Sequence, residues 1–423
     1  MLGDAGIGWR SDSPAAPEHP PLPRQTHILP FVLVTIFIDS IGFGLIMPVL
    51  PRLLMRVGSM TLDQTIALGA WMGLATAVAS FVAAPIMGNL SDAYGRRRVL
   101  LVALAGLVLD YLLLSFAGSI ALIFLGRILS GIFGGSYGAA QASIADVTPP
   151  EQRARNFGMV GAAFGMGFVA GPALGGLLSE FGPRTPFLAA AVLAGINFIY
   201  GLTLFPDTLK PENRRAFSLA RANPLGAWRT LRATPGMLGI ALVLLLWQIA
   251  SLVYPMTWSF WGIAQLGWSD RMIGLSLAAV GVVIALSQTF FTGPVVRRFG
   301  ERNAASIGLA GASAGFFADA FTTSTVVAFA LLGAIVLQSL VQPSLMAMLS
   351  RRATASNQGE TQGISAMAMG LGSICAPLVL TAPLAHFTAP GAPVHFPGAA
   401  FIMATLFGLA ALVLLRRLPA AQA

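Results

Sequence analysis

The sequence predicts an all-α membrane protein with twelve transmembrane helices arranged as two six-helix halves. Three observations support this fold: the composition, a series of apolar segments and an internal repeat. Of the 423 residues, 56% are hydrophobic and only 10% are charged, and the mean hydropathy is +0.77. Soluble domains carry about 25% charged residues. A chain this apolar therefore belongs in lipid, where helices satisfy their own backbone hydrogen bonds.

Twelve apolar segments approach the ~20 residues that a bilayer-spanning helix needs. The predicted spans are 28–50, 66–87, 98–117, 119–140, 157–179, 185–205, 236–262, 273–295, 304–324, 325–349, 362–385 and 395–415. An even number of spans places both termini on one side of the membrane.

The distribution of positive charge predicts which side that is. With the N-terminus inside, cytoplasmic segments hold 20 of the 25 Lys and Arg residues. External loops hold Arg52, Arg56, Arg184 and Arg271. Both termini are therefore predicted to be cytoplasmic. The net charge is +9, and the basic residues fall in short loops between spans. This distribution argues against a nucleic-acid partner.

The polar linker between the sixth and seventh spans divides the chain into two halves. Residues 1–27 lack the layout of a signal peptide and are expected to form a disordered cytoplasmic tail. The predicted units are this tail, a first half 28–205, a cytoplasmic linker 206–235, a second half 236–417 and a cytoplasmic tail 418–423.

An internal repeat supports the division into halves. Gly88 and Gly95 recur 205 residues later as Gly293 and Gly300. The same offset relates Gly158 and Pro172 to Gly363 and Pro377. One offset in two separate regions indicates duplication, although glycine and proline are common enough for chance matches.

Residues 88–101, GNLSDAYGRRRVLL, are predicted to form a cytoplasmic hairpin between two spans. Gly88 and Gly95 allow a tight turn and close helix approach. Asp92 is expected to accept hydrogen bonds from nearby helix N-termini, while Arg96 and its neighbours hold the loop inside. An ordinary basic loop is the alternative. The spacing resembles the signature loop between helices 2 and 3 of the major facilitator superfamily.

Four ionisable residues lie inside predicted spans, namely Asp39, Asp110, Arg127 and Asp319. Each costs about 2.5–3.5 kcal/mol at a helix centre, so each is expected to face the protein interior. Arg127 stays protonated, and Asp110 is its expected partner, either in proton coupling or in a static ion pair. Asp39 is expected to bind a proton or a cationic substrate, or else to form a structural hydrogen bond.

The fifth span contains GAAFGMGFVAGPALGG, with small residues at helical spacing. Its marked positions are Gly167, Gly171, Pro172, Gly175 and Gly176. The glycines are expected to lie largely on one face, and Pro172 to kink the helix. The order resembles the span-5 motif of antiporters in the same superfamily, where it is thought to prevent proton leak. A general packing face is the alternative.

An aromatic and methionine-rich seventh span is a candidate cavity wall, because aromatics stack on flat ligands and methionine adapts to varied shapes. The candidates, with Asp319, are Gln248, Tyr254, Met256 and Trp258. An interfacial aromatic belt is the alternative. No phosphate-binding loop, paired-histidine metal motif or nucleophile–base pair occurs, so neither an enzyme nor a metal site is predicted.

The chain resembles the tetracycline–proton antiporters and related twelve-helix drug exporters over most of its length. The resemblance rests on DSIGFGLIMPVLP (39–51), residues 88–101, LDYLLL (109–114), the stretch 126–158, residues 161–176, the stretch 274–302 and QPSLMAMLSRR (342–352). It implies that the span-1 and span-3 acids affect transport and that Asp92 and Arg96 act in the conformational cycle. Ile284 and Ala312 stand where those relatives carry a histidine and an acid, so tetracycline itself is less strongly implied.

These features together predict a proton-coupled antiporter that exports a hydrophobic or amphipathic drug, with tetracycline as one candidate. The alternatives are a transporter of a polar metabolite and a non-transporting receptor or scaffold. The expected partners are the drug, protons and the lipid bilayer, with no cofactor beyond the proton gradient. The expected location is a bacterial inner membrane, and the expected state is a monomer.

Overall fold

The computed structural model describes residues 28–134, 136–218, 231, 237–352 and 358–419, all without β-strands. Most of the predicted tails and the second part of the predicted linker, 219–230 and 232–235, lie outside these residues. The all-α fold is confirmed for the described part. Within it, twelve helical stretches are long and apolar enough to cross a membrane, as predicted.

The first half contains eight described helices in six spans, because one span consists of two helices and another is followed by a short extra helix. They are α1 (Ile28–Ile46), α2 (Leu50–Gly58), α3 (Leu62–Tyr94), α4 (Arg96–Phe116), α5 (Ile120–Phe133), α6 (Ser136–Val147), α7 (Pro150–Leu178) and α8 (Thr185–Leu204). Here α5 and α6 form one span, and α2 is a short helix after the first span.

The second half repeats the six spans with more interruptions. Its helices are α10 (Met237–Ser251), α11 (Val253–Leu266), α12 (Asp270–Leu286), α13 (Gly293–Phe299), α14 (Glu301–Phe321), α15 (Thr325–Leu331), α16 (Ile335–Gln338), α17 (Val341–Ser350), α18 (Gln358–Thr388) and α19 (Ala399–Arg417). A π-helical segment, Ser287–Thr292, joins α12 to α13.

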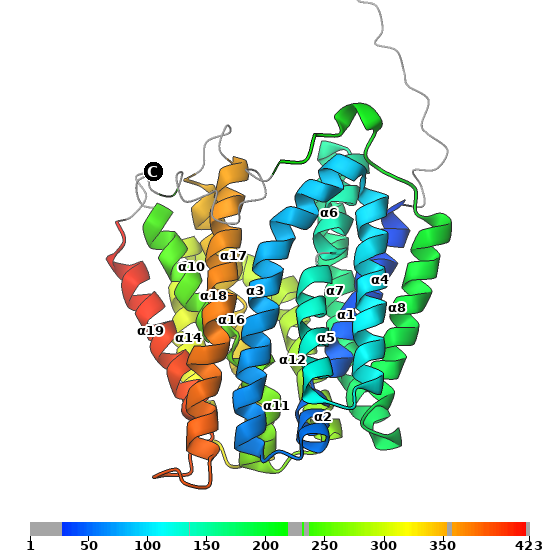
Figure 1. Cartoon of the computed structure of the whole chain (residues 1–423). Helices are drawn as coiled ribbons and strands as arrows, with labels where there is room; N and C mark the ends of the chain where they lie inside the picture. Colours follow the sequence, from blue (N-terminus) through cyan, green and yellow to red (C-terminus); the bar gives the residue numbers. More distant parts are fainter. Residues whose placement is uncertain (1–27, 135, 219–230, 232–236, 353–357, 420–423) are drawn as a thin grey trace, which may run out of the picture.

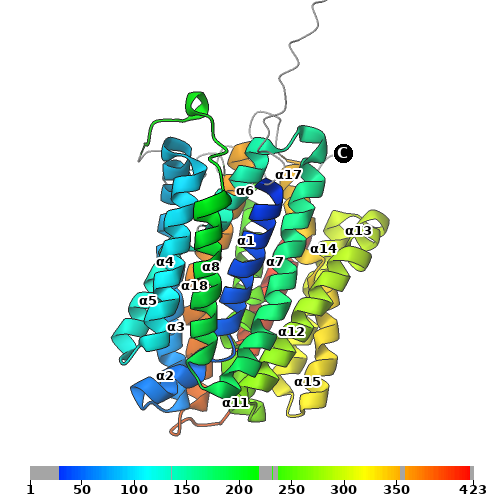
Figure 2. The same ribbon diagram turned by 90° about the vertical axis from the view of Figure 1, so that its right-hand side faces the viewer.

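The two ends of the bundle differ in what they carry (Figure 1). We call the end with residues 206–218 and the last turn of α19 the linker end. The other end, which carries α2 and the connection between α18 and α19, is called the opposite end. Figure 2 shows α1 and α7 side by side along the first half, and these two helices are in extensive contact.

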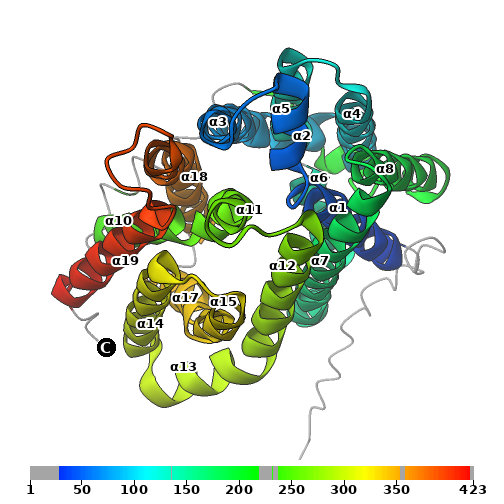
Figure 3. The same ribbon diagram turned by 90° about the horizontal axis from the view of Figure 1, so that it is seen from below.

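Two helix pairs join the halves along their length, α7 with α12 and α3 with α18. Seen along the bundle, the helices of the first half lie together on one side and those of the second half on the other (Figure 3). The two pairs lie at the boundary between them. One continuous hydrophobic cluster fills the second half, whereas the first half contains two smaller clusters.

The backbone itself shows the internal duplication. Gly95 has φ +100° and directly precedes α4, and Gly300, 205 residues later, has φ +75° and directly precedes α14. L-residues with a side chain rarely adopt such φ values, so glycine is favoured at both turns. The repeat predicted from sequence is thus confirmed at this pair of positions.

The predicted hairpin at 88–101 is shorter than expected. α3 remains helical to Tyr94 and α4 begins at Arg96, so only Gly95 separates them. Gly88 and Asp92 therefore lie on a helix rather than in a loop. A Cβ added at Gly88 would meet no described atom within 4 Å, so the expected close approach at Gly88 is wrong for this part of the structure.

Candidate functional site

A buried ion pair lies inside the first half, where lipid-facing charge would be most costly. Arg127 Nη2 of α5 donates to both carboxylate oxygens of Asp110 on α4, at 2.9 and 3.3 Å. Asp110 is fully buried and Arg127 is 9% exposed. A Cβ on Gly126 would lie 2.7 Å from Asp110 Oδ1, so glycine at this position leaves room for the carboxylate. The pairing expected from the sequence is present.

The backbone beside this ion pair is tied to α3. Thr76 Oγ1 donates to the carbonyl oxygen of Arg127 at 3.0 Å, and Ser80 Oγ donates to that of Gly131 at the same distance. A Cβ on Gly131 would lie 2.5 Å from the carbonyl oxygen of Thr76, so α3 and α5 approach closely here. The backbone of α5 beside the ion pair is therefore held directly against α3.

Asp39 of α1 belongs to a separate polar group that joins α1 to α8. Asn197 Nδ2 donates to Asp39 Oδ1 at 3.2 Å, and Thr35 Oγ1 donates to Asn197 Oδ1 at 3.1 Å. Asn197 is fully buried. The sequence analysis did not predict a role for Asn197. An amide in an otherwise apolar span could have indicated one, because a polar side chain inside the membrane needs a partner just as a buried acid does. Asp39 is partly buried, and the hydrogen bond itself does not require a negative charge.

The glycines of the fifth span pack α7 against two helices. Added Cβ atoms at Gly167, Gly171 and Gly175 would lie 2.5, 2.7 and 2.3 Å from carbonyl oxygens of α1. At Gly176 the nearest atom, at 2.7 Å, is the carbonyl oxygen of Asp270 on α12. Gly176 therefore faces the second half, which corrects the expectation of a single face.

Pro172 lies on this same two-sided surface. Its carbonyl oxygen would be 2.3 Å from a Cβ on Gly274 of α12, and its ring carbon Cδ would be 2.6 Å from a Cβ on Gly44 of α1. α7 continues through Pro172 without a break in its assigned helix, from Pro150 to Leu178. The motif thus brings three backbones together at the boundary between the halves.

At the linker end, the charged residues of the stretch 88–101 pair within the first half. Arg96 Nη1 donates to Asp92, and Arg96 Nε donates to Asp146 Oδ2 of α6 at 3.0 Å. The acceptor at the N-terminus of α4 is Asp207 of the linker, whose Oδ1 accepts from the backbone N–H of Arg96 at 3.0 Å. The prediction that Asp92 accepts from a helix N-terminus is therefore not met, and Asp207 takes that place in this conformation.

The aromatic residues of the seventh span form part of the second half's core. Trp258 is 1% exposed and donates from Nε1 to Ser276 Oγ at 2.8 Å. Tyr254 donates to Asp319 Oδ2 at 2.8 Å, and Asp319 is 1% exposed. Tyr254 and Trp258 line neither the predicted cavity nor a membrane interface, because both are enclosed by protein. Met256 is half-buried against the same core cluster.

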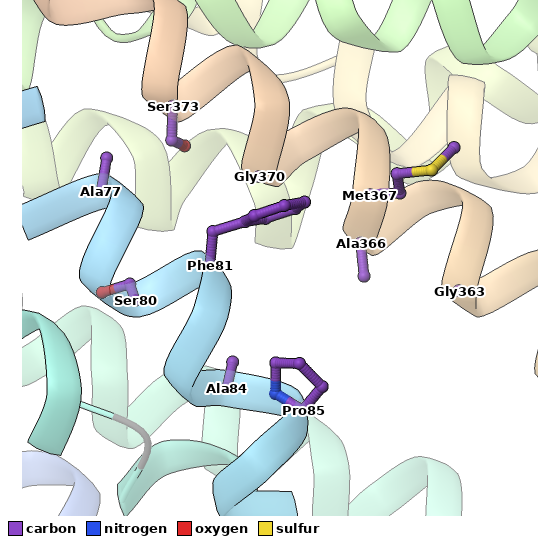
Figure 4. A pocket seen from close by; sticks show the side chains of 10 residues that line it. All are labelled: Ala77, Ser80, Phe81, Ala84, Pro85, Gly363, Ala366, Met367, Gly370 and Ser373. Atoms are coloured by element: carbon purple, nitrogen blue, oxygen red, sulfur yellow. The ribbon is translucent and has the colours of Figure 1, made fainter. Parts of the chain in front are cut away.

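A cavity of about 500 Å³ lies between α3 and α18, at the boundary between the halves (Figure 4). It is lined by Ala77, Ser80, Phe81, Ala84, Pro85, Gly363, Ala366, Met367, Gly370 and Ser373. These side chains are uncharged, and Phe81 supplies their aromatic ring. Gln248 of α10 touches the cavity wall indirectly, since its Nε2 donates to Ser373 Oγ at 3.3 Å. The other predicted cavity residues lie outside this lining.

At the opposite end, polar contacts hold the halves together. Ser259 of α11 donates to the carbonyl oxygen of Met47 at 2.9 Å, and Arg52 of α2 donates to that of Trp268 at 2.8 Å. Arg271 pairs with Glu180 at 3.2 Å. Within the described residues, no three His, Cys, Asp or Glu side chains gather where they would hold a metal ion.

Comparison with known proteins agrees with this architecture. A family model of the major facilitator superfamily matches residues 32–262 and 237–423. The class C tetracycline resistance protein of Escherichia coli is 39% identical over 85% of this chain and 90% of its own length. The class G protein of Vibrio anguillarum is 36% identical over 83% of this chain and 88% of its own.

Solved structures show the same fold. The nucleoside transporter NupG superposes with a TM-score of 0.76 at 13% identity, covering 92% of this chain and 99% of its own. The human organic anion transporter MFSD10 gives 0.67 at 22% identity over 93% of this chain and all of its own. The family model and the curated relatives show that the chain belongs to the major facilitator superfamily, in the family that contains the tetracycline resistance proteins.

Proposed function

We propose that this protein is a proton-coupled antiporter that exports a hydrophobic or amphipathic drug by alternating access. The observation that carries the proposal is the double role of α3. One face of α3 lines the cavity between the halves, and Thr76 and Ser80 tie the same helix to the α5 backbone at Arg127 and Gly131. Protonation of Asp110 would thus change the position of the helix that lines the cavity.

The ion pair supplies a physical basis for coupling. Protonation of Asp110 removes the countercharge of Arg127, whose guanidinium stays charged at any biological pH. An uncompensated buried charge costs about 3–5 kcal/mol, which is comparable to the gap between transporter conformations. Protonation therefore favours rearrangement of α4 and α5, and α3 moves with them.

Charge placement supports an orientation with the linker end in the cytoplasm, and the bacterial relatives support a location in the inner membrane. Twenty of the 25 Lys and Arg residues fall in segments that this orientation places inside. The relatives named tetracycline resistance proteins come from bacteria. The proposal includes a monomer driven by the proton gradient, with no further cofactor, no metal and no catalytic reaction.

The cavity favours a drug over a polar metabolite. Its described lining has two hydroxyl groups, one phenyl ring and one thioether, and no charged side chain. Such a wall recognises apolar and flat surfaces rather than carboxylates, phosphates or many hydroxyls. Tetracycline is a candidate because the relatives carry its name, while Ile284 and Ala312 differ from the residues that the resemblance implies for handling it.

The test is a resistance panel in an efflux-deficient bacterium that expresses the whole chain. We expect raised tolerance to tetracycline or to another amphipathic drug, and we expect the gain to disappear when a protonophore collapses the gradient. Asp110→Asn is the matched variant and should express but give no gain. Unchanged tolerance across the panel, together with uptake of a sugar or organic anion by purified protein in liposomes, would contradict the proposal. Absence of any flux would favour a receptor or scaffold.

A further inference from the structure

We propose that the linker ends of the two halves carry charge patterns of opposite sign that pair with each other when this end closes. The inference rests on the proposed alternating-access function, because closure of the linker end is one of its steps. It adds a docking surface on each half and names the other half as its partner.

The two patterns occupy equivalent positions of the internal repeat. The first-half trio is Asp92, Arg96 and Asp146, and the second-half trio is Arg297, Glu301 and Arg351. Each member of the second trio lies 205 residues after its counterpart, the offset that also relates Gly95 to Gly300. At all three positions the sign of the charge is reversed. The first trio carries a net charge of −1 and the second +1.

The structure shows that these positions are equivalent in space as well as in sequence. Arg96 Nε lies 3.0 Å from Asp146 Oδ2, which joins the start of α4 to α6. Arg351 Nε lies 2.9 Å from Glu301 Oε1, which joins the start of α14 to the residue that follows α17. Each half therefore has one such ion pair, which we call its clamp, between equivalent helices. The acid and the base are exchanged between the two clamps.

The exchange matters because of the symmetry between the halves. Parallel repeats are related by an axis along the membrane normal, and across a two-fold interface a residue near the axis meets its own equivalent. A faithful duplication would bring acids toward acids when the linker end closes, and like charges repel. Reversal at all three positions makes the same approach attractive. Local clamping alone requires no such reversal, since either polarity forms the ion pair.

In each trio at least one member has an exposed side chain that is free to approach a second partner in this conformation. The side chain of Arg351 is 76% exposed and that of Asp92 is 40% exposed. Carboxylates and guanidinium groups each accommodate several hydrogen bonds. α6 and α17 belong to different halves and both end at the linker end (Figures 1 and 2). Contacts such as Arg52 with Trp268 hold the halves together at the opposite end. Closure of the linker end would bring Asp146 and Arg351 together.

Cysteine cross-linking tests the approach directly in the full-length chain. The variant carries Asp146→Cys and Arg351→Cys in a Cys375→Ser background, and a short bismaleimide is applied to membrane vesicles. Linked peptides are identified by mass spectrometry. Adding Arg52→Ala should weaken the opposite end and raise the 146–351 yield about fivefold, the scale of a modest conformational coupling. The control pair, Arg96→Cys with Asp146→Cys, lies within one half and should link in both backgrounds.

Absence of a 146–351 link in both backgrounds, with the control pair linked, would overturn the inference. That result would leave the proposed function intact if the unsubstituted chain still exports drug under a gradient. Conversely, a link that increases with Arg52→Ala in a chain without drug export would support the docking surface and contradict the function.

A charge reversal separates docking from local clamping. Glu301→Arg with Arg351→Glu keeps an ion pair within the second half but gives this clamp the polarity of the first half. We expect slower drug efflux and faster labelling of a Ser373→Cys cavity probe from the linker side, because the linker end closes less often. The neutral pair Glu301→Gln with Arg351→Gln loses the clamp without repulsion and should show a smaller change. Efflux and labelling at the unsubstituted level in the reversed variant would also overturn the inference.

Discussion

Arg52 of α2 lies 3.1 Å from Asp270 at the start of α12, and this ion pair joins the two halves at the opposite end. Asp270 is 7% exposed, whereas the Arg52 side chain is 44% exposed, so this pair is shielded from water on its acid side. The neighbouring pair of Arg271 with Glu180 is more than half exposed on both sides. An ion pair with one buried partner leaves that charge uncompensated when the other partner is lost, whereas exposed pairs contribute about 0–1 kcal/mol. We therefore expect Arg52 and Asp270 to contribute more to the closed state of this end than Arg271 and Glu180.

Breaking the Arg52–Asp270 pair should open the opposite end. We expect Arg52→Ala or Asp270→Asn to speed labelling of a Phe260→Cys probe by an impermeant maleimide, in a Cys375→Ser background. Phe260 is a suitable site because its ring lies against Gly69 of the first half and is 7% exposed. Arg271→Ala is the control and should change the rate little. Equal rates in all of these variants would show that the pair does not hold this end closed.

Removing the acid of the buried pair should impair both stability and coupling. Asp110→Asn leaves the Arg127 charge without a carboxylate, at a cost of about 3 kcal/mol. We expect a lower melting temperature in detergent and loss of uphill efflux in everted vesicles. The double variant Asp110→Asn with Arg127→Gln should recover much of the melting temperature but not the efflux. Normal uphill efflux by Asp110→Asn would remove this pair from the coupling mechanism.

Asp39→Asn offers a cleaner test of charge in the first span. An amide oxygen at position 39 still accepts the Asn197 hydrogen bond, so the contact between α1 and α8 is retained. We expect near-normal expression and melting with reduced proton-driven efflux. A variant that transports normally would assign Asp39 the structural role that the sequence also allowed.

The glycine face of α7 should tolerate no side chain where backbones meet. Gly171→Ala would place Cβ 2.7 Å from the carbonyl oxygen of Ile41 and 2.8 Å from Gly44 Cα. Overpacking of this kind costs about 1–3 kcal/mol, so we expect a lower melting temperature and weaker efflux. Gly165→Ala on the same helix meets no described atom within 4 Å and should be neutral or stabilising by about 0.5–1 kcal/mol. The two variants behaving alike would contradict the packing argument.

The cavity should lose affinity for flat drugs when its aromatic ring is removed. Phe81→Ala is expected to reduce export of planar aromatic compounds about threefold to tenfold, the range that ring contacts contribute. Gly370→Ala should alter the drug range rather than abolish export, since its Cβ would lie 2.4 Å from Phe81 Cδ2 and the ring must turn. Phe116→Ala, at a site 70% exposed, is the control. The comparison uses half-inhibitory concentrations across planar and non-planar drugs.

Much of the fold follows from the sequence because lipid imposes simple rules. Apolar length predicts the spans, and the cost of intramembrane charge predicts that Arg127 pairs with Asp110. The repeat offset predicts that Gly95 and Gly300 have equivalent roles. These inferences need only local sequence and the requirement that buried charges find partners.

The predictions that were wrong about the position or contacts of a residue have a common physical cause. A helix that is apolar all round gives no periodic signal of which side faces lipid, cavity or core. Tyr254 and Trp258 therefore carry no mark in the sequence that places them in the core. Asp207 reaches α4 across a long separation along the chain, and no local pattern reports such a contact. For this reason the sequence could not predict that Asp207, rather than Asp92, accepts the hydrogen bond at the N-terminus of α4.

The composition of the cavity wall has a consequence for how resistance evolves. Replacing Trp258 or Tyr254 would disturb a packed core and lower the amount of folded transporter. Ala77, Ala84, Ala366 and Gly363 are small, line open space, and take no part in the ion pairs described above. Under drug selection, inherited changes that widen the range of exported compounds are therefore expected to accumulate on α3 and α18, and the tryptophan-rich segment to stay nearly constant among descendants.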